Sequence, residues 1–292
     1  MTDKLKFDIT ELMRLIQTHT IKIAQFVPTM IAMMLDHPDF GKYDVTSLRL
    51  ITYGSAPMQP ELIARVMKAL PHVQFAQAFG MTEASPIATL LNPEDHMGRD
   101  EAGLRRLYSV GRAAPFLDMK IVDENRHERP IGEVGEIALR GPNIMQGYWE
   151  KPDLTAEVLE NGWYYTGDAG SIDDEGYLHL AGRYKDMVIT GGENVYPIEV
   201  ERILDAHPDV ADVAIIGTPD DKWGERVHAI IRPSAGSTPD EQALKDYCRE
   251  RLAHYKCPTL ISFTNDPLPL TKVNKTDKVA LRKIYNKDKA GA

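Results

Sequence analysis

The heptapeptide FGMTEAS, residues 79–85, gathers side chains that could hold a nucleotide into one short break between apolar segments. Phe79 offers a flat ring, Thr82 a hydroxyl and Glu83 a carboxylate that can bind a metal ion. Gly80 allows the chain to turn where a side chain would clash. This set suits a phosphate-bearing aromatic ligand. It also suits an ordinary turn, so other segments must decide between the two interpretations.

A carboxylate and an arginine further along the chain could complete such a site. Asp168 follows a strand-like run and a Thr-Gly turn in YYTGDAG, where a carboxylate can accept hydrogen bonds from a ribose diol. A solvated turn aspartate explains the same pattern. Arg183 lies in GRYKDM and is followed by Gly191 and Gly192, whose backbone can approach a ligand closely. A solvated linker between two domains is the alternative interpretation of this stretch.

Three lysines precede the last apolar segment of the chain. Lys272, Lys275 and Lys278 lie in the polar stretch TKVNKTDK, and most lysines in such loops are solvated. A lysine carried into a phosphate site by a mobile domain would have a very different role. The residue pattern alone leaves this choice open.

The composition indicates a globular protein and argues against several classes. Of 292 residues, 43% are hydrophobic and 26% are charged, and the net charge is −9. A nucleic-acid-binding protein would be expected to carry a basic domain. Cys248 and Cys257 match neither a disulfide framework nor a zinc motif. The sequence shows no apolar signal core and no apolar run long enough to cross a membrane, so we expect a cytoplasmic protein.

Apolar runs and glycines in the first hundred residues predict an α/β sheet that would position these side chains. Residues 10–35 are typical of a helix, a strand and a helix. Buried strands are predicted over 48–54 and 73–80, with a helix over 60–70 between them. This order is typical of a parallel sheet. Ligands bind at the carboxyl ends of such strands, so YGSAPM and FGMTE should face one crevice.

The pattern then changes twice, which predicts a chain of α/β and α+β class. Short strands cut by glycines over about 105–184 indicate a small antiparallel, β-barrel-like subdomain of a larger α/β domain, which we place at 1–184. Alternating helices and strands over 185–292 indicate a compact α+β C-terminal domain. The boundary falls near GRYKDM.

Five segments in this order resemble successive motifs of one family. They are YGSAPM, FGMTEAS, GYWEKPDLTAEVL with GWYYTGDAG, GRYKDMVITGGENVYPIEVE and LPLTKVNKTDKVALR. The family is the acyl-adenylate-forming (AMP-binding) superfamily, which comprises acyl-CoA synthetases, nonribosomal adenylation domains and firefly-type luciferases. The stretch ITGGENVYPIEVE is most similar to fatty-acyl and related acid–CoA ligases.

The resemblance assigns roles to the residues singled out above. It implies that Phe79 stacks on adenine, that Thr82 binds the phosphate region and that Glu83 helps to hold Mg²⁺. Asp168 would take the ribose hydroxyls, and Arg183 would reach the ribose and phosphate. The other positions that the resemblance places around the nucleotide or the acyl group are Gly54, Ser55, Ala56, Pro57, Gly80 and Met81. Phe26 and Val27, with Met81, are expected to line the acid pocket.

The resemblance also implies a mobile C-terminal domain. Lys275 matches the lysine that bridges the attacking carboxylate and the α-phosphate, and Lys185 matches the hinge. The family lysine usually follows glycine, whereas Asn274 precedes Lys275 here. Asn tolerates a left-handed conformation next best, so the register among the three lysines stays open.

Two half-reactions follow from the resemblance. A carboxylate attacks the α-phosphate of ATP and expels pyrophosphate. The small domain then rotates, the loop of Gly191, Gly192 and Glu193 reaches the site, and the thiol of CoA attacks the activated carbonyl and expels AMP. The expected ligands are therefore ATP or AMP, Mg²⁺, CoA and a small carboxylic acid. An adenylation domain that loads a carrier protein is one alternative, and a non-catalytic fragment that binds a nucleotide or a partner is another.

One family element is absent from the sequence. The Ser/Thr/Gly-rich phosphate loop lies well before IKIAQFVPT in the family, so the resemblance implies that this chain is the C-terminal part of a longer enzyme. We therefore expect little adenylation by these residues alone. The first strand would also leave an open sheet edge, which favours self-association into a homo-oligomer.

Overall fold

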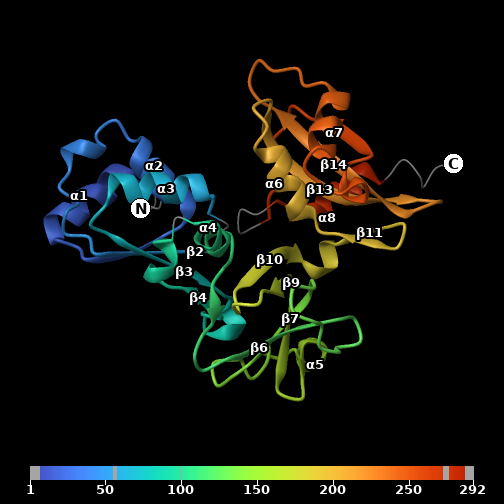
Figure 1. Ribbon diagram of the computed structural model, residues 1–292, viewed down its shortest axis with the longest axis horizontal. Helices are drawn as coiled ribbons and strands as arrows, with labels where there is room; N and C mark the ends of the chain where they lie inside the picture. The colour runs from blue at the N-terminus through green and yellow to red at the C-terminus, as the bar shows by residue number, and fades with distance from the viewer. Residues whose placement is uncertain (1–6, 55–57, 99, 272–275, 287–292) are drawn as a thin grey trace. The chain divides into compact units, whose positions relative to one another are not determined.

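The computed structural model describes residues 7–54, 58–98, 100–271 and 276–286 (Figure 1). The chain divides into two compact units. The N-terminal unit comprises Met1–Thr166 and Gly170–Leu180, and the C-terminal unit comprises Gly167–Ala169 and Ala181–Ala292. Each unit is described by itself below.

The N-terminal unit begins with a five-stranded sheet in the order β1–β2–β3–β4–β5. The strands β1, β2 and β3 run parallel, as the sequence predicts, whereas β4 and β5 are antiparallel additions. The bounds of the five strands are β1 Ile23–Phe26, β2 Leu50–Gly54, β3 Gln74–Phe79, β4 Thr89–Leu91 and β5 Arg112–Ala113.

Three helices, α1, α2 and α3, share one hydrophobic core with this sheet (Figure 1). The predicted helices over 10–35 and 60–70 are confirmed, and proline occupies the first position of both α2 and α3. Ile51 of β2, Phe75 of β3 and Ile16 of α1 all lie in that core. The helices and short 3-10 turns here are α1 Ile9–His19, α2 Pro28–Asp36, α3 Pro60–Ala69, α4 Glu101–Leu107, η1 Phe40–Lys42, η2 Thr82–Ala84 and η3 Pro93–His96.

The glycine-rich region forms an open sheet rather than the barrel-like subdomain that the sequence suggested. Its order is β10–β9–β7–β6, with β8 paired to β9, and no barrel closes among the residues that the structure describes. The edge strands β10 and β6 have no pairing with each other in that order. The elements are β6 Asp118–Val122, β7 Gly135–Arg140, α5 Pro152–Val158, β8 Leu159–Glu160, β9 Trp163–Ile172 and β10 Leu178–Arg183.

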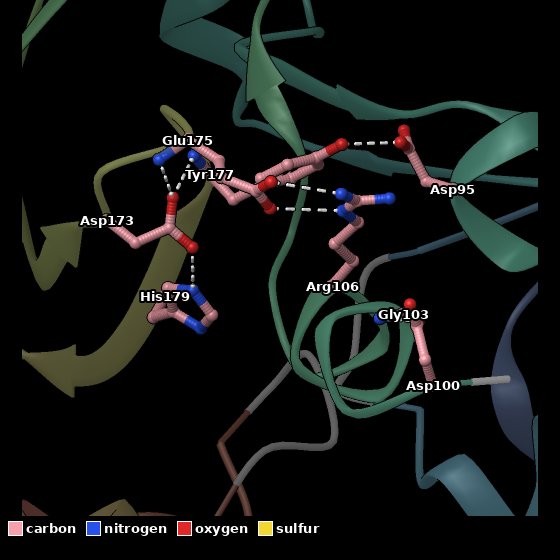
Figure 2. A network of polar contacts seen from close by, with 8 residues as sticks. All are labelled: Asp95, Asp100, Gly103, Arg106, Asp173, Glu175, Tyr177 and His179. Carbon is pink, nitrogen blue, oxygen red and sulfur yellow. Dashed lines mark hydrogen bonds and ion pairs between the residues drawn. The ribbon is translucent and has the colours of Figure 1, made fainter. Parts of the chain in front are cut away.

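A polar network ties the turn between β9 and β10 to η3 and α4 (Figure 2). The Tyr177 hydroxyl donates to Asp95 Oδ1 at 2.5 Å, and Arg106 makes two hydrogen bonds to Glu175, at 3.0 and 3.2 Å. The Asp173 carboxylate accepts from the backbone N–H groups of Glu175 and Tyr177 and lies 2.9 Å from the His179 ring. No local pattern predicts its long-range contacts, because Asp95 and Arg106 lie far along the chain from Tyr177 and Glu175.

The C-terminal unit contains a five-stranded mixed sheet in the order β12–β11–β14–β13, with β15 parallel to β14. Helices cover both faces of it. Ile215 of β13 packs in one core with α6 and α7, whereas its neighbour Ile216 packs in a second core with Leu281 of α8. This is the predicted α+β architecture. The elements are η4 Tyr184–Asp186, β11 Val188–Thr190, β12 Glu193–Val195, α6 Pro197–Asp205, β13 Val210–Asp220, β14 Gly224–Pro233, α7 Glu241–Arg249, η5 His254–Lys256, β15 Leu260–Phe263 and α8 Lys278–Tyr285.

Among the described residues, no helix is both long and apolar enough to cross a membrane. The sequence likewise predicted no membrane span.

Candidate functional site

The loop after β3 folds back on itself and leaves no room for a side chain at Gly80, and strand pairing leaves none at Gly54 at the end of β2. The Ala88 N–H donates to the Phe79 carbonyl oxygen at 2.9 Å. A Cβ on Gly80 would lie 1.8 Å from the Pro86 carbonyl oxygen, and one on Gly54 would lie 2.4 Å from the Ala78 carbonyl oxygen. The sequence interpretation of Gly80 as a turn without space for a side chain is therefore confirmed.

The Glu83 carboxylate is held by a residue far away in the sequence. Glu83 lies in η2 and is half-buried, whereas its neighbour Thr82 is exposed. The Tyr148 hydroxyl donates to Glu83 Oε1 at 2.9 Å, and the Met145 N–H donates to the Glu83 backbone carbonyl oxygen at 2.8 Å. This loop thus presents a hydroxyl and an oriented carboxylate directly after a parallel strand, where α/β sheets bind ligands.

Asn143 fixes the rest of the same loop. Its Nδ2 lies 2.6 Å from the Ala84 carbonyl oxygen and 3.1 Å from the Ile87 carbonyl oxygen. Both partners are acceptors only, so the amide nitrogen must face them. Neither Asn143 nor Tyr148 was assigned a role from the sequence, although Tyr148 lies in the quoted motif GYWEKPDLTAEVL.

The residues expected around an acid pocket lie in different surroundings. Phe26 is 3% exposed and belongs to the core beneath α1, α2 and α3. Val27 caps α2 and is half-buried, and Met81 is half-buried beside the core that contains Ala84. Ser55, Ala56 and Pro57 lie outside the described residues.

Asp168 and Arg183, both predicted to bind ribose, form an ion pair in the C-terminal unit. Arg183 Nε lies 3.1 Å from Asp168 Oδ1. The Asp168 side chain is 16% exposed and that of Arg183 is 52% exposed. The carboxylate is thus sheltered while the guanidinium reaches solvent.

The predicted hinge residue, Lys185, lies in η4. Its neighbour Asp186 accepts a hydrogen bond from Arg282 of α8, with a distance of 2.9 Å from Arg282 Nη1 to Asp186 Oδ1. The last helix therefore contacts the residue next to the predicted hinge.

Gly191 and Gly192 make the turn between β11 and β12, with φ angles of +60° and +84°. Positive φ favours glycine at both positions. The Gly191 N–H donates to the Trp223 carbonyl oxygen at 2.8 Å, and a Cβ on Gly191 would lie 2.9 Å from the Trp223 ring. Glu193 begins β12 and is exposed.

One of the three candidate lysines has a structural partner. Lys278 Nζ lies 2.7 Å from Glu201 Oε1, and both side chains are largely buried. The same carboxylate oxygen accepts from the Ile215 N–H at 2.8 Å. Lys272 and Lys275 lie outside the described residues.

The described residues contain no group of three or more His, Cys, Asp or Glu side chains that could hold a metal ion. A Mg²⁺ ion bound mainly by substrate phosphates and water needs only one or two carboxylates from the protein. Glu83 can supply one, so the residues fit an ion that arrives with a nucleotide.

Comparison with known proteins decides the family. The sequence profile of the AMP-binding enzyme family matches residues 1–149, and that of the AMP-binding enzyme C-terminal domain matches residues 199–275. The chain belongs to the AMP-binding enzyme family. The resemblance inferred from the five motifs is thereby confirmed.

Individual members of this family are similar along nearly the whole chain. An indoleacetate–CoA ligase of Aromatoleum aromaticum is 39% identical over 96% of this chain and 53% of its own length. A medium/long-chain-fatty-acid–CoA ligase of Mycobacterium tuberculosis is 38% identical over 95% of the chain and 48% of its own. A fatty acid–[acyl-carrier-protein] ligase of Streptomyces coeruleorubidus is 37% identical over 94% of this chain and 52% of its own length.

The fold agrees with solved structures of AMP-binding enzymes. The amide bond synthetase McbA of Marinactinospora thermotolerans superposes with a TM-score of 0.84 at 34% identity, over 96% of this chain and 55% of that one. The mixed α/β fold class is therefore confirmed. The chain spans about half the length of the curated relatives that it matches.

Proposed function

We propose that the protein activates a hydrophobic carboxylic acid, in the first place a fatty acid, with ATP and transfers the acyl group to CoA. The observation that carries this proposal is the loop after β3, where Glu83 is oriented by Tyr148 beside the exposed Thr82. Membership of the AMP-binding enzyme family supports it. The similar CoA ligases act on indoleacetate and on medium- or long-chain fatty acids, which are both apolar acids with one carboxylate.

In the first half-reaction, the acid's carboxylate oxygen would form a bond to the α-phosphorus of ATP. The bond from the α-phosphorus to the α–β bridging oxygen would break, and pyrophosphate would leave with that oxygen. Phe79 would stack on adenine, Thr82 would bond to the phosphate region, and Glu83 would hold Mg²⁺. The ion, when bound, neutralises phosphate charge. Lys275 would approach the carboxylate and α-phosphate, where its charge offsets their repulsion.

The sugar would be held by the sheltered carboxylate of Asp168. Arg183, its ion-pair partner, can reach the ribose and phosphate because its guanidinium is exposed. Gly54, Ser55, Ala56 and Pro57 would form the wall between adenine and the acyl group, and Gly80 and Met81 would lie beside the nucleotide. Lys278 is engaged by Glu201, which argues against Lys278 as the adenylation lysine.

In the second half-reaction, the CoA thiolate sulfur bonds to the acyl carbon, and AMP leaves with its phosphate oxygen. Rotation at Lys185 would bring Gly191, Gly192 and Glu193 to the acyl-adenylate. Residues 1–184 and residues 185–292 would then act as two domains, of which the second is mobile.

A carrier protein is the second candidate acceptor, because one similar family member is a fatty acid–[acyl-carrier-protein] ligase. ATP–pyrophosphate exchange with short, medium and long fatty acids and aryl acids tests the first half-reaction. Thioester formation with CoA or with a carrier protein tests the second. Exchange with fatty acids and thioester formation with CoA are expected. Nucleotide binding without exchange for any acid would instead support a non-catalytic role.

A further inference from the structure

Segment 143–148, between β7 and α5, contacts the Glu83 loop through its side chains and its backbone. The hydrogen bonds from Asn143 and from the Met145 N–H reach backbone carbonyl oxygens of the loop. Of these groups, the Tyr148 hydroxyl reaches the carboxylate itself, at 2.9 Å from Oε1. The loop backbone and the Glu83 side chain are thus held by different groups, so the two effects can be separated by mutation.

Tyr148 is itself anchored. Its backbone N–H donates to Thr155 Oγ1 at 2.9 Å, and the Thr155 hydroxyl donates to the Lys151 carbonyl oxygen at 2.8 Å. A Cβ on the preceding residue, Gly147, would lie 2.8 Å from Thr155 Cγ2. The Tyr148 backbone therefore lies tightly against the start of α5, which fixes the point from which the ring extends.

A glutamate side chain has three rotatable bonds, and ordering them on binding costs conformational entropy. A donor that already holds the side chain in place removes part of that cost. The hydroxyl of Tyr148 occupies one of about four acceptor sites on the carboxylate, and the remaining sites suffice for a metal ion or a water ligand. The contact therefore orients Glu83 without consuming it.

We propose that Tyr148 is a positioning residue that pre-orients the Glu83 carboxylate for the metal–nucleotide substrate. This inference rests on the proposed function. It assigns Tyr148 no contact with the substrate. Its effect should appear when the metal ion is part of the ligand and should vanish when the ligand is a nucleotide without metal.

Isothermal titration of the chain with MgATP, and with AMP in the presence of EDTA, separates these cases. For Tyr148→Phe, the Kd of MgATP should rise about 5- to 10-fold, as expected when the cost of ordering one glutamate side chain falls on the binding step. The Kd of metal-free AMP should stay within about twofold of the wild-type value. The matched control is Tyr43→Phe, because Tyr43 packs against the core of the same unit, and it should leave both constants unchanged.

The double variant shows whether Tyr148 acts through Glu83. Glu83→Gln should raise the Kd of MgATP more than Tyr148→Phe does. The double variant should have the same Kd as Glu83→Gln alone, because Tyr148 acts only through the Glu83 carboxylate. Thr155→Val should weaken the binding of MgATP slightly, whereas Thr155→Ser, which keeps the hydroxyl, should bind MgATP as the wild type does. These two variants test the anchoring if Tyr148→Phe does not fold.

The outcomes distinguish this inference from the proposed function. Wild-type MgATP affinity in Tyr148→Phe, equal loss for MgATP and metal-free AMP, or full additivity with Glu83→Gln would overturn the role of Tyr148 alone. Wild-type MgATP affinity in Glu83→Gln, or absence of nucleotide binding by every form, would overturn the assignment of Glu83 in the proposed function and this inference with it.

Discussion

The Arg282 guanidinium of the last helix donates to the Asp186 carboxylate, which belongs to the residue directly after Lys185. The two side chains are largely buried, and Arg282 Nη2 also lies 3.5 Å from the Asp186 backbone oxygen. The predicted hinge is therefore bounded on one side by a residue fixed to the body of the C-terminal unit. Rotation about Lys185 would carry Asp186 and α8 together.

Lys185→Pro should slow thioester formation at least about tenfold more than it slows adenylation, because proline fixes φ and restricts rotation at that residue. The two half-reactions are measured separately, with ATP–pyrophosphate exchange and with supplied acyl-adenylate plus CoA, in protein competent for both. Lys185→Ala is the control and should affect both steps little. Equal losses in the two half-reactions would contradict the hinge assignment.

Lys275→Ala should slow ATP–pyrophosphate exchange by roughly 10²-fold or more, as expected for a lost transition-state charge contact. Thioester formation from supplied acyl-adenylate should change little. Lys278→Ala should instead lower the stability of the C-terminal unit, because it leaves the Glu201 carboxylate without its lysine. If Lys278→Ala or Lys272→Ala showed the selective loss of exchange, the register of the lysine assignment would be wrong.

Tyr177→Phe should lower the free energy of unfolding by about 1–3 kcal/mol, because the half-buried Asp95 carboxylate loses the hydrogen bond from the buried Tyr177 side chain. The ring can remain against the Arg112 guanidinium, which lies 4.3 Å from its centroid. Urea unfolding of the chain measures the effect. Tyr255→Phe, at an exposed position, should stay within about 0.5 kcal/mol of the wild type. Equal stabilities of the two variants would rule out an energetic role for the network in Figure 2.

His228 should make the C-terminal unit less stable in acid. Burial, helped by the nearby charge of Arg226, lowers the pKa of its imidazole from 6.5 to about 4. Between these values the unfolded chain binds more protons than the folded chain. The free energy of unfolding therefore falls as the pH drops from 6.5 to 4, by up to about 3 kcal/mol.

The comparison with His228→Gln isolates this contribution, because all other titrating groups are shared. The ring nitrogens of His228 contact the hydroxyls of Thr218 and Ser262, each at 2.9 Å, and an amide can contact the same groups. Stability measured by urea unfolding from pH 4 to 7 should depend less steeply on pH in the variant. Parallel curves would contradict the assignment of the acid sensitivity to His228.

Local sequence patterns predicted several helix starts and strand ends correctly. Pro28 and Pro60 mark helix starts, and the apolar runs that end at Gly54 and Gly80 are the strands β2 and β3. By contrast, the end of α7 at Arg249 follows no such local signal. Neither a proline nor a glycine marks the position at which α7 ends. The segment that follows α7 is held by a tertiary contact that no local pattern reports, since Lys256 pairs with Glu199 of α6 at 2.5 Å.

In the candidate site, too, residues that are close in sequence could be predicted, whereas contacts between distant residues could not. Gly80 and Glu83 could be proposed as site residues because their loop is continuous in sequence. Tyr148 lies 65 residues from Glu83, and Asp95 lies 82 residues from Tyr177, so only the folded chain brings them together. The barrel-like expectation failed for a related reason: glycine-rich strands are typical of barrels and of small open sheets alike, and closure depends on edge pairing.

The arrangement of β14 has a consequence for how the C-terminal unit folds. β13 and β14 form a hairpin of adjacent strands, whereas the parallel pairing of β14 with β15 joins His228 to Leu260 across all of α7. Non-local pairings of this kind slow folding because a long loop must close before its contacts contribute. We therefore expect the rate-limiting step in folding of this unit to be the docking of β15, with the hairpin already in place.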